Sequence, residues 1–88
     1  MNSVTVSGFW QLYRKLPRKI RDAARVAYRQ FLTDPAHPGL QFHRLATAPQ
    51  LWSVRITRGY RAVGLVRGAT ITWFWIGDHE AFDREFSR

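Results

Sequence analysis

The chain has 88 residues, the size of one small domain, and we expect residues 1–88 to fold as a single unit. It contains no cysteine, which excludes disulfides and cysteine-based zinc sites and is compatible with a reducing cytoplasm. No apolar run approaches the roughly 20 residues that cross a bilayer. We therefore expect a cytoplasmic protein with no membrane partner.

The formal net charge of +8 is unevenly distributed. Residues 1–77 hold twelve of the 14 basic residues and only Asp22 and Asp34 as acids, whereas the other four acids lie within residues 78–85. Most of the basic residues are arginine, whose planar guanidinium matches phosphate. Such a field favours RNA, DNA or an acidic protein as partner, and the alternative is a basic surface that only confers solubility.

The first half of the chain predicts a strand and two helices. Residues 3–6 alternate weakly and indicate a short strand. Residues 8–16 carry apolar side chains at helical spacing, and Ser7 could cap that helix. Pro17 opens a second helix, which ends near Thr33 because Asp34-Pro35 disfavours the helical conformation.

This second helix is amphipathic. Its apolar stripe consists of Ile20, Ala24, Ala27, Tyr28 and Phe31. Its other face carries Arg18, Arg21, Arg25 and Arg29, with Asp22 as the one nearby acid. That face is either a solvated surface or a docking stripe for an acidic partner.

Beyond Gly39 the apolar pattern changes to the period of two that indicates strands. Residues 40–45 form a possible strand, and clearer strands are predicted over 51–57, 60–67 and 70–76. The turns between them are Arg58-Gly59 and Arg67-Gly68. The C-terminal segment, 78–86, is polar and compatible with one or two helical turns. The predicted fold is therefore α+β: a strand, two helices and a three- to four-stranded antiparallel sheet.

One group of residues could carry chemistry: Arg55, Arg58, Tyr60, Arg61 and His79. If the hairpin tip lies beside the exit of the last strand, an imidazole faces several guanidinium groups. Metal-free cleavage of RNA needs such an arrangement, because a base removes the 2′-OH proton and cations stabilise the charged phosphorus. A histidine after a strand can equally be structural, and these arginines could pair with Asp78, Glu80 and Asp83 in a salt-bridge network.

Other chemistries find no support in the sequence. It has no phosphate-binding loop, dinucleotide fingerprint, zinc-protease motif or nucleophile elbow, so we expect no cofactor and no metal. His43, beside Arg44, is a further candidate for contact with RNA, whereas His37 lies in a predicted loop.

The ordered set of motifs resembles the RelE/ParE family of toxins from toxin–antitoxin pairs. The resemblance runs over nearly the whole chain in the same order, through the segments 9–17 (FWQLYRKLP), 34–40 (DPAHPGL), 51–56 (LWSVRI), 60–63 (YRAV) and 75–84 (WIGDHEAFDR). The resemblance implies a β-α-α-β-β-β fold and a cognate antitoxin that wraps the toxin. RelE-like members cut mRNA in the ribosomal A site without metal, whereas ParE-like members poison DNA gyrase.

The resemblance also implies roles for individual residues. Arg55 and Arg61 match arginines that contact the scissile phosphate in the nucleases, and His79 matches their C-terminal histidine. We therefore expect a catalytic set of His79, Arg61 and Arg55, and RNA contacts from Arg58, Tyr60, His43, Arg44 and Phe82. Phe82 stands where tyrosine is common, so a hydroxyl is missing there. Three hypotheses follow: an mRNA endoribonuclease, a gyrase poison or inactive member that binds only its antitoxin, and an RNA-binding protein without toxicity.

Overall fold

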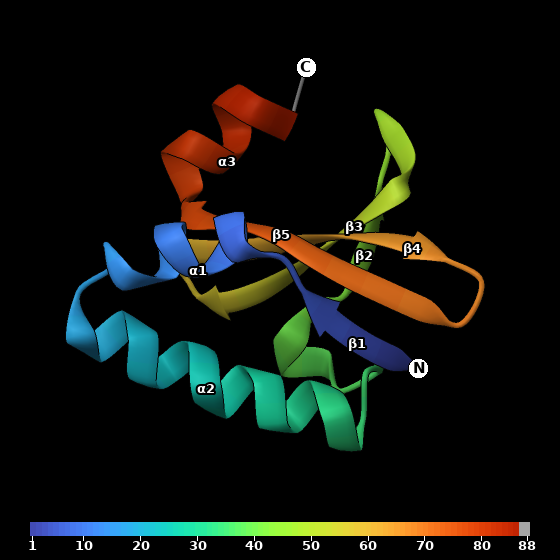
Figure 1. Ribbon diagram of the computed structural model, residues 1–88, viewed down its shortest axis with the longest axis horizontal. Coiled ribbons are helices and arrows are strands. Elements are labelled where there is room, and N and C mark those ends of the chain that lie inside the picture. Colours follow the sequence, from blue (N-terminus) through green and yellow to red (C-terminus); the bar gives the residue numbers. More distant parts are fainter. Residues whose placement is uncertain (87–88) are drawn as a thin grey trace.

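The computed structural model describes residues 1–86 (Figure 1). The elements follow in the order β1 (Asn2–Thr5), α1 (Ser7–Arg14), α2 (Arg18–Thr33), the 3₁₀ turn η1 (Pro38–Leu40), β2 (His43–Leu45), β3 (Ala48–Thr57), β4 (Tyr60–Arg67), β5 (Thr70–Asp78) and α3 (His79–Phe86). This order confirms the predicted α+β class. None of the helices among these residues is long and apolar enough to cross a membrane.

The strands form one mixed sheet in the order β1-β5-β4-β3-β2. The meander β2–β5 is antiparallel, as predicted, while β1 adds a parallel edge strand to β5, with Asn2 opposite Thr70 and Thr5 opposite Trp73. The meander thus has four strands, within the predicted range, and the predicted N-terminal strand joins it to make a five-stranded sheet. The pairing of β1 was not predicted, because its partners on β5 lie almost seventy positions away in the sequence.

The sheet has two differently covered faces. Helices α1 and α2 pack on one of them, which we call the helical face, and α3 lies on the opposite side, which we call the α3 face (Figure 1). The core lies on the helical face. It comprises Phe9 and Tyr13 from α1, Ala24, Ala27 and Phe31 from α2, Leu40, and Val54, Ala62, Ile71, Trp73 and Ile76 from the strands.

Two local predictions are wrong in detail. Ser7 lies in the first turn of α1 rather than capping it, because Val6 occupies the N-cap position and no side chain caps the helix. The predicted strand over residues 40–45 begins only at His43. Pro38 starts a 3₁₀ turn that buries Leu40, and Gln41 then adopts a left-handed conformation with φ 45°, which a strand cannot contain.

Candidate active site

The hairpin between β3 and β4 lies directly beside the exit of β5. The backbone N–H of His79 donates to the carbonyl of Gly59 in the hairpin turn at 2.8 Å. Tyr60 is opposite Asp78, and Arg61 is opposite Gly77. The antiparallel register therefore brings the predicted arginine-rich turn and the predicted histidine to one end of the sheet.

Phe82, in α3, contacts both Arg61 and His79. The guanidinium carbon of Arg61 lies 5.7 Å from the centre of its ring. The imidazole of His79 stacks on it with a centroid separation of 6.3 Å and an interplanar angle of 16°. Because Phe82 itself is buried, its ring serves as a platform for Arg61 and His79.

Arg55 and Arg61 occupy directly opposite positions on β3 and β4. Both point to the α3 face, because their neighbours Val54 and Ala62 belong to the core on the helical face. Within residues 1–86 neither arginine takes part in an ion pair. Like charges placed opposite each other destabilise a sheet, so this pair is a feature that folding alone does not favour.

His79 stands at the start of α3 and is half exposed. Its Nε2 lies 3.4 Å from Oδ2 of Asp83, one helical turn further on, so the carboxylate fixes the orientation of the ring. Asp78 caps the start of α3, because its Oδ1 accepts a hydrogen bond from the backbone N–H of Ala81 at 2.8 Å. Asp78 and Asp83 thus both contact residues of α3, and among residues 1–86 no ion pair joins either of them to Arg55 or Arg61.

The two candidates on β2 point to opposite sides of the sheet. His43 is opposite Ser53 and shares the α3 face with Arg55. Arg44 is opposite Trp52, which packs against the core of the helical face, so Arg44 lies on the wrong side to join the cluster. Both side chains are exposed.

The two remaining candidates in the hairpin, Arg58 and Tyr60, also lie apart from the cluster on the α3 face. Arg58 is exposed at the tip of the hairpin, beside Gly59. Tyr60 precedes Arg61 on β4, so strand alternation directs its side chain to the helical side. The cluster on the α3 face therefore consists of Arg55, Arg61, His79 and Phe82, with His43 at its margin.

Sequence reasoning missed the support beneath this cluster. The register of β5 against β4 shifts at Phe74, so Trp73 faces the core while Trp75 faces α3, although an undisturbed strand would place both on one side. The Trp75 ring packs at 5.2 Å from Phe86 and 6.3 Å from Phe82. A Cβ on Gly77 would lie 2.7 Å from the Trp75 ring, so the absence of a side chain there leaves room for the indole.

This arrangement suits an anionic, phosphate-bearing ligand. Two guanidinium groups that have no acidic partner among residues 1–86 can hold and neutralise phosphate oxygens, and an oriented imidazole beside them can transfer a proton. No group of three or more potential metal ligands occurs within the described part of the chain.

The family model of the ParE-like toxin domain matches residues 18–84, most of the chain and all of the cluster. The chain belongs to the ParE-like toxin family. No curated protein sequence matches this toxin.

Solved structures of toxins share the toxin's fold. The RelB–RelE antitoxin–toxin complex from Methanococcus jannaschii aligns with a TM-score of 0.75 at 14% identity, over 94% of this chain and 98% of that one. A YoeB/ParE toxin from Agrobacterium tumefaciens aligns with a TM-score of 0.69 at 20% identity, over 90% and 99%. The isolated RelE toxin from E. coli gives 0.66 at 19% identity, over 94% and 96%. At these identities the likeness establishes the RelE/ParE fold.

Proposed function

We propose that this toxin is a metal-free endoribonuclease that cuts mRNA on the ribosome and is neutralised by a cognate antitoxin. The observation that carries the proposal is the opposed pair Arg55 and Arg61, without an acidic partner in residues 1–86, next to His79. A like-charge pair at the exposed end of a sheet lowers stability, and a bound phosphate would reverse that effect.

The cleavage step follows from the positions of these groups. The Nε2 of His79 is turned to Asp83, which leaves Nδ1 to take the proton of the RNA 2′-OH. The 2′-oxygen then attacks the adjacent phosphorus, and the bond to the 5′-oxygen of the next nucleotide breaks, giving a 2′,3′-cyclic phosphate and a 5′-OH end. The leaving oxygen takes up a proton from the imidazolium or from water. Arg61 and Arg55 stabilise the charge of the pentacoordinate phosphorus.

Family membership supports the wider biological role. Toxins of this type pair with antitoxins, and one of the similar structures is itself a RelB–RelE complex. The net charge of +8 fits both an RNA target and an acidic antitoxin.

The test is cleavage of a defined mRNA in a purified translation system, with the cut ends mapped by primer extension. We expect codon-positioned cuts with wild type and a 10²- to 10³-fold lower rate, on the order of an oxyanion-site deletion, for Arg61→Ala and His79→Ala. Arg67→Ala, which removes an arginine from the distant β4–β5 turn, should retain nearly full activity. Wild type that gives no positioned cuts would refute the proposal.

Inhibition of DNA gyrase is the second candidate function, and Phe82 favours it. The platform under Arg61 and His79 has no hydroxyl group, so the site offers one imidazole and no second acid–base side chain on that ring. Supercoiling by purified gyrase with and without the toxin separates the two functions. Unchanged supercoiling in the presence of a molar excess of toxin eliminates the gyrase hypothesis.

A further inference from the structure

Two adjoining hollows lie at the corner between α1 and α2, on the helical face of the sheet and thus opposite to Arg61 and His79. One is an apolar cleft with a volume of about 330 Å³, and the other is a polar recess of about 300 Å³. Tyr13 and Arg25 line both of them. One ligand with an apolar part and an anionic part can therefore occupy the cleft and the recess together.

Aromatic rings form much of the wall of the cleft. Among them, Trp10 is 41% exposed and Tyr28 is 39% exposed, so a ligand can reach both rings from solvent. The indole N–H of Trp10 donates to the hydroxyl of Thr5 at 2.9 Å, and the hydroxyl of Tyr28 donates to that of Ser3 at 3.0 Å. Rings held in this way form a preorganised aromatic surface on which a nucleobase can stack at low entropic cost.

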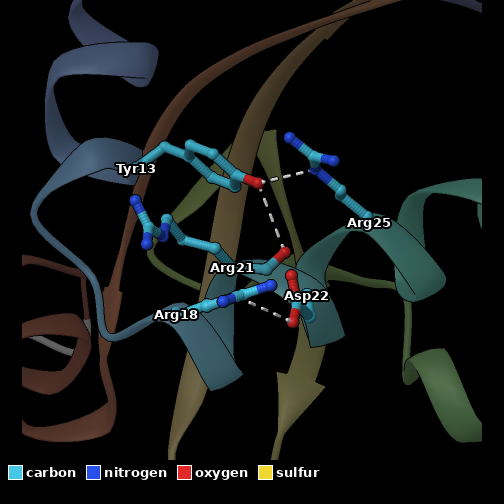
Figure 2. Close-up of polar contacts among 5 residues, drawn as sticks. All are labelled: Tyr13, Arg18, Arg21, Asp22 and Arg25. Atoms are coloured by element: carbon cyan, nitrogen blue, oxygen red, sulfur yellow. Dashed lines mark hydrogen bonds and ion pairs between the residues drawn. The ribbon is translucent and has the colours of Figure 1, made fainter.

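The recess is lined by guanidinium groups. Arg18, Arg21 and Arg25 surround it, and the acid in its lining, Asp22, lies 4.0 Å from Arg18. Figure 2 shows the hydroxyl of Tyr13, which accepts the Nε–H of Arg25 at 3.1 Å and donates to the carbonyl of Arg21 at 3.3 Å. The hydrogen bond to Tyr13 raises the pKa of Arg25 above its ordinary value, so this guanidinium stays charged. Its two terminal nitrogens can donate to an anion while Nε is held.

The positive charge of the recess continues along α2. Seven of the 14 basic residues of the chain lie within residues 14–29, where Asp22 is the one acid. The row of arginines runs from Arg18 to Arg29, which also lines the cleft, and the helix rises by about 16 Å between them. A row of this length is longer than the phosphate of a mononucleotide and suits a strand that carries several phosphates.

We infer that the cleft and the recess bind a single-stranded nucleic acid, with one unpaired base in the cleft and the neighbouring phosphates on the arginines of α2. The binding does not select a base sequence, because the cleft offers apolar and aromatic surface on which any base can stack. A duplex is excluded, since its bases are paired and cannot enter the cleft. This inference goes beyond the proposed function, and it does not depend on RNA cleavage because it concerns binding alone.

The test compares two fluorescently labelled hexamers by their anisotropy on binding to the full chain. One is a 2′-O-methylated RNA, which the proposed reaction cannot cut because it has no free 2′-OH. The other is its abasic counterpart, which keeps the phosphates and lacks the bases. We expect wild type to bind the complete hexamer about ten-fold more tightly than the abasic one.

Variants of the two hollows should have different effects. Trp10→Ala should reduce the preference for the complete hexamer to less than three-fold and leave binding of the abasic hexamer unchanged. Tyr28→Leu, which keeps an apolar side chain but removes the exposed ring, should reduce the preference in the same direction. Arg25→Ala should instead weaken binding of both hexamers about equally, by about five-fold, and lower the slope of affinity against salt by about one counterion.

Arg67→Ala is the matched control for charge, because it removes one arginine at the far β4–β5 turn and should keep both affinities within about two-fold. Thermal unfolding verifies that each variant is folded. The inference is overturned if wild type binds both hexamers equally well, or if Trp10→Ala and Tyr28→Leu both keep the full preference for bases. It is also overturned if Arg67→Ala weakens binding as much as Arg25→Ala, or if a duplex of the same length or AMP binds as tightly as the complete hexamer. A toxin that cuts no mRNA would alter none of these expectations.

Discussion

The two faces of the sheet carry different kinds of residue at equivalent strand positions. On the helical face, Val54 and Ala62 stand opposite each other and are buried; one residue further along each strand, on the α3 face, Arg55 and Arg61 stand opposite each other and are only half buried. The first pair contributes apolar burial and therefore stability. The second contributes like charges and therefore costs stability. Residues that stabilise the fold thus alternate with residues of the candidate site along β3 and β4.

The largest loss of stability should come from truncating a buried side chain on the helical face. Phe31 is 2% exposed and packs edge to face against Phe42 and Trp73, with centroid distances of 5.0 and 5.4 Å. We expect Phe31→Ala to lower the free energy of unfolding by about 3–5 kcal/mol. Urea denaturation followed by tryptophan fluorescence measures it.

The neighbouring residue provides the control. Leu32 is 56% exposed, and Leu32→Ala should change stability by less than about 0.5 kcal/mol. If Phe31→Ala proves too unstable to purify, Phe31→Leu should still show the larger loss of the two positions. Equal losses at 31 and 32 would mean that the core is not centred on the helical face.

A smaller effect is expected where the two faces depend on each other. Gly77→Ala would place a methyl group against the Trp75 ring, which supports Phe82 and α3. We expect overpacking to lower the free energy of unfolding by about 1–3 kcal/mol. We also expect a loss of mRNA cleavage, because Arg61 lies directly opposite Gly77 in the sheet.

A second glycine gives the matched comparison. Gly8 lies in α1, and no atom is near the position that a Cβ would occupy. Gly8→Ala should therefore raise the free energy of unfolding by about 0.5–1 kcal/mol and leave cleavage unchanged. A stable Gly77→Ala variant with full cleavage would show that the aromatic support does not position Arg61.

A loss of about 1 kcal/mol in the free energy of unfolding is expected from removing the Tyr13 hydroxyl, which links α1 to Arg21 and Arg25 of α2 (Figure 2). Tyr13→Phe keeps the buried ring but removes the hydrogen bonds to Arg21 and Arg25, each worth about that much or less. We expect a small fall in melting temperature with unchanged mRNA cleavage, because Tyr13 lies on the face of the sheet opposite to Arg61 and His79. A variant that cleaves mRNA more slowly would contradict the separation of the two faces.

The sequence predicted the order of elements because local periodicity and turn residues determine it. It also predicted that the hairpin tip and His79 would be neighbours, since consecutive antiparallel strands place their ends together. The parallel pairing of β1 with β5 joins residues far apart in the sequence. So do the two hydrogen bonds that the Ser3 hydroxyl accepts from Tyr28 and Trp73, and no local pattern encodes any of these contacts.

Side-chain direction was the weakest part of the prediction. The irregularity at Phe74 reverses the face of Trp75, and strand alternation separates Arg44 and Tyr60 from Arg61. The role of Phe82 as a platform for Arg61 depends on the angle at which α3 returns over the sheet, which composition does not determine. The residue types of the site were therefore predictable, whereas their grouping required the fold.

The smallest effect has the opposite sign and tests the comparison most directly. Arg55→Thr removes one member of the opposed pair and introduces a residue suited to strands, so stability should rise by about 0.2–1 kcal/mol. Cleavage should fall in the same variant, because the phosphate loses one of its two cations. The gain in stability should shrink at high salt, which screens the repulsion that the mutation relieves. Arg67→Thr, opposite Thr70 rather than another arginine, should show no such salt-dependent gain. A loss of stability in Arg55→Thr at low salt would mean that the two arginines do not repel each other, and the argument that this pair is retained for binding phosphate would then fail.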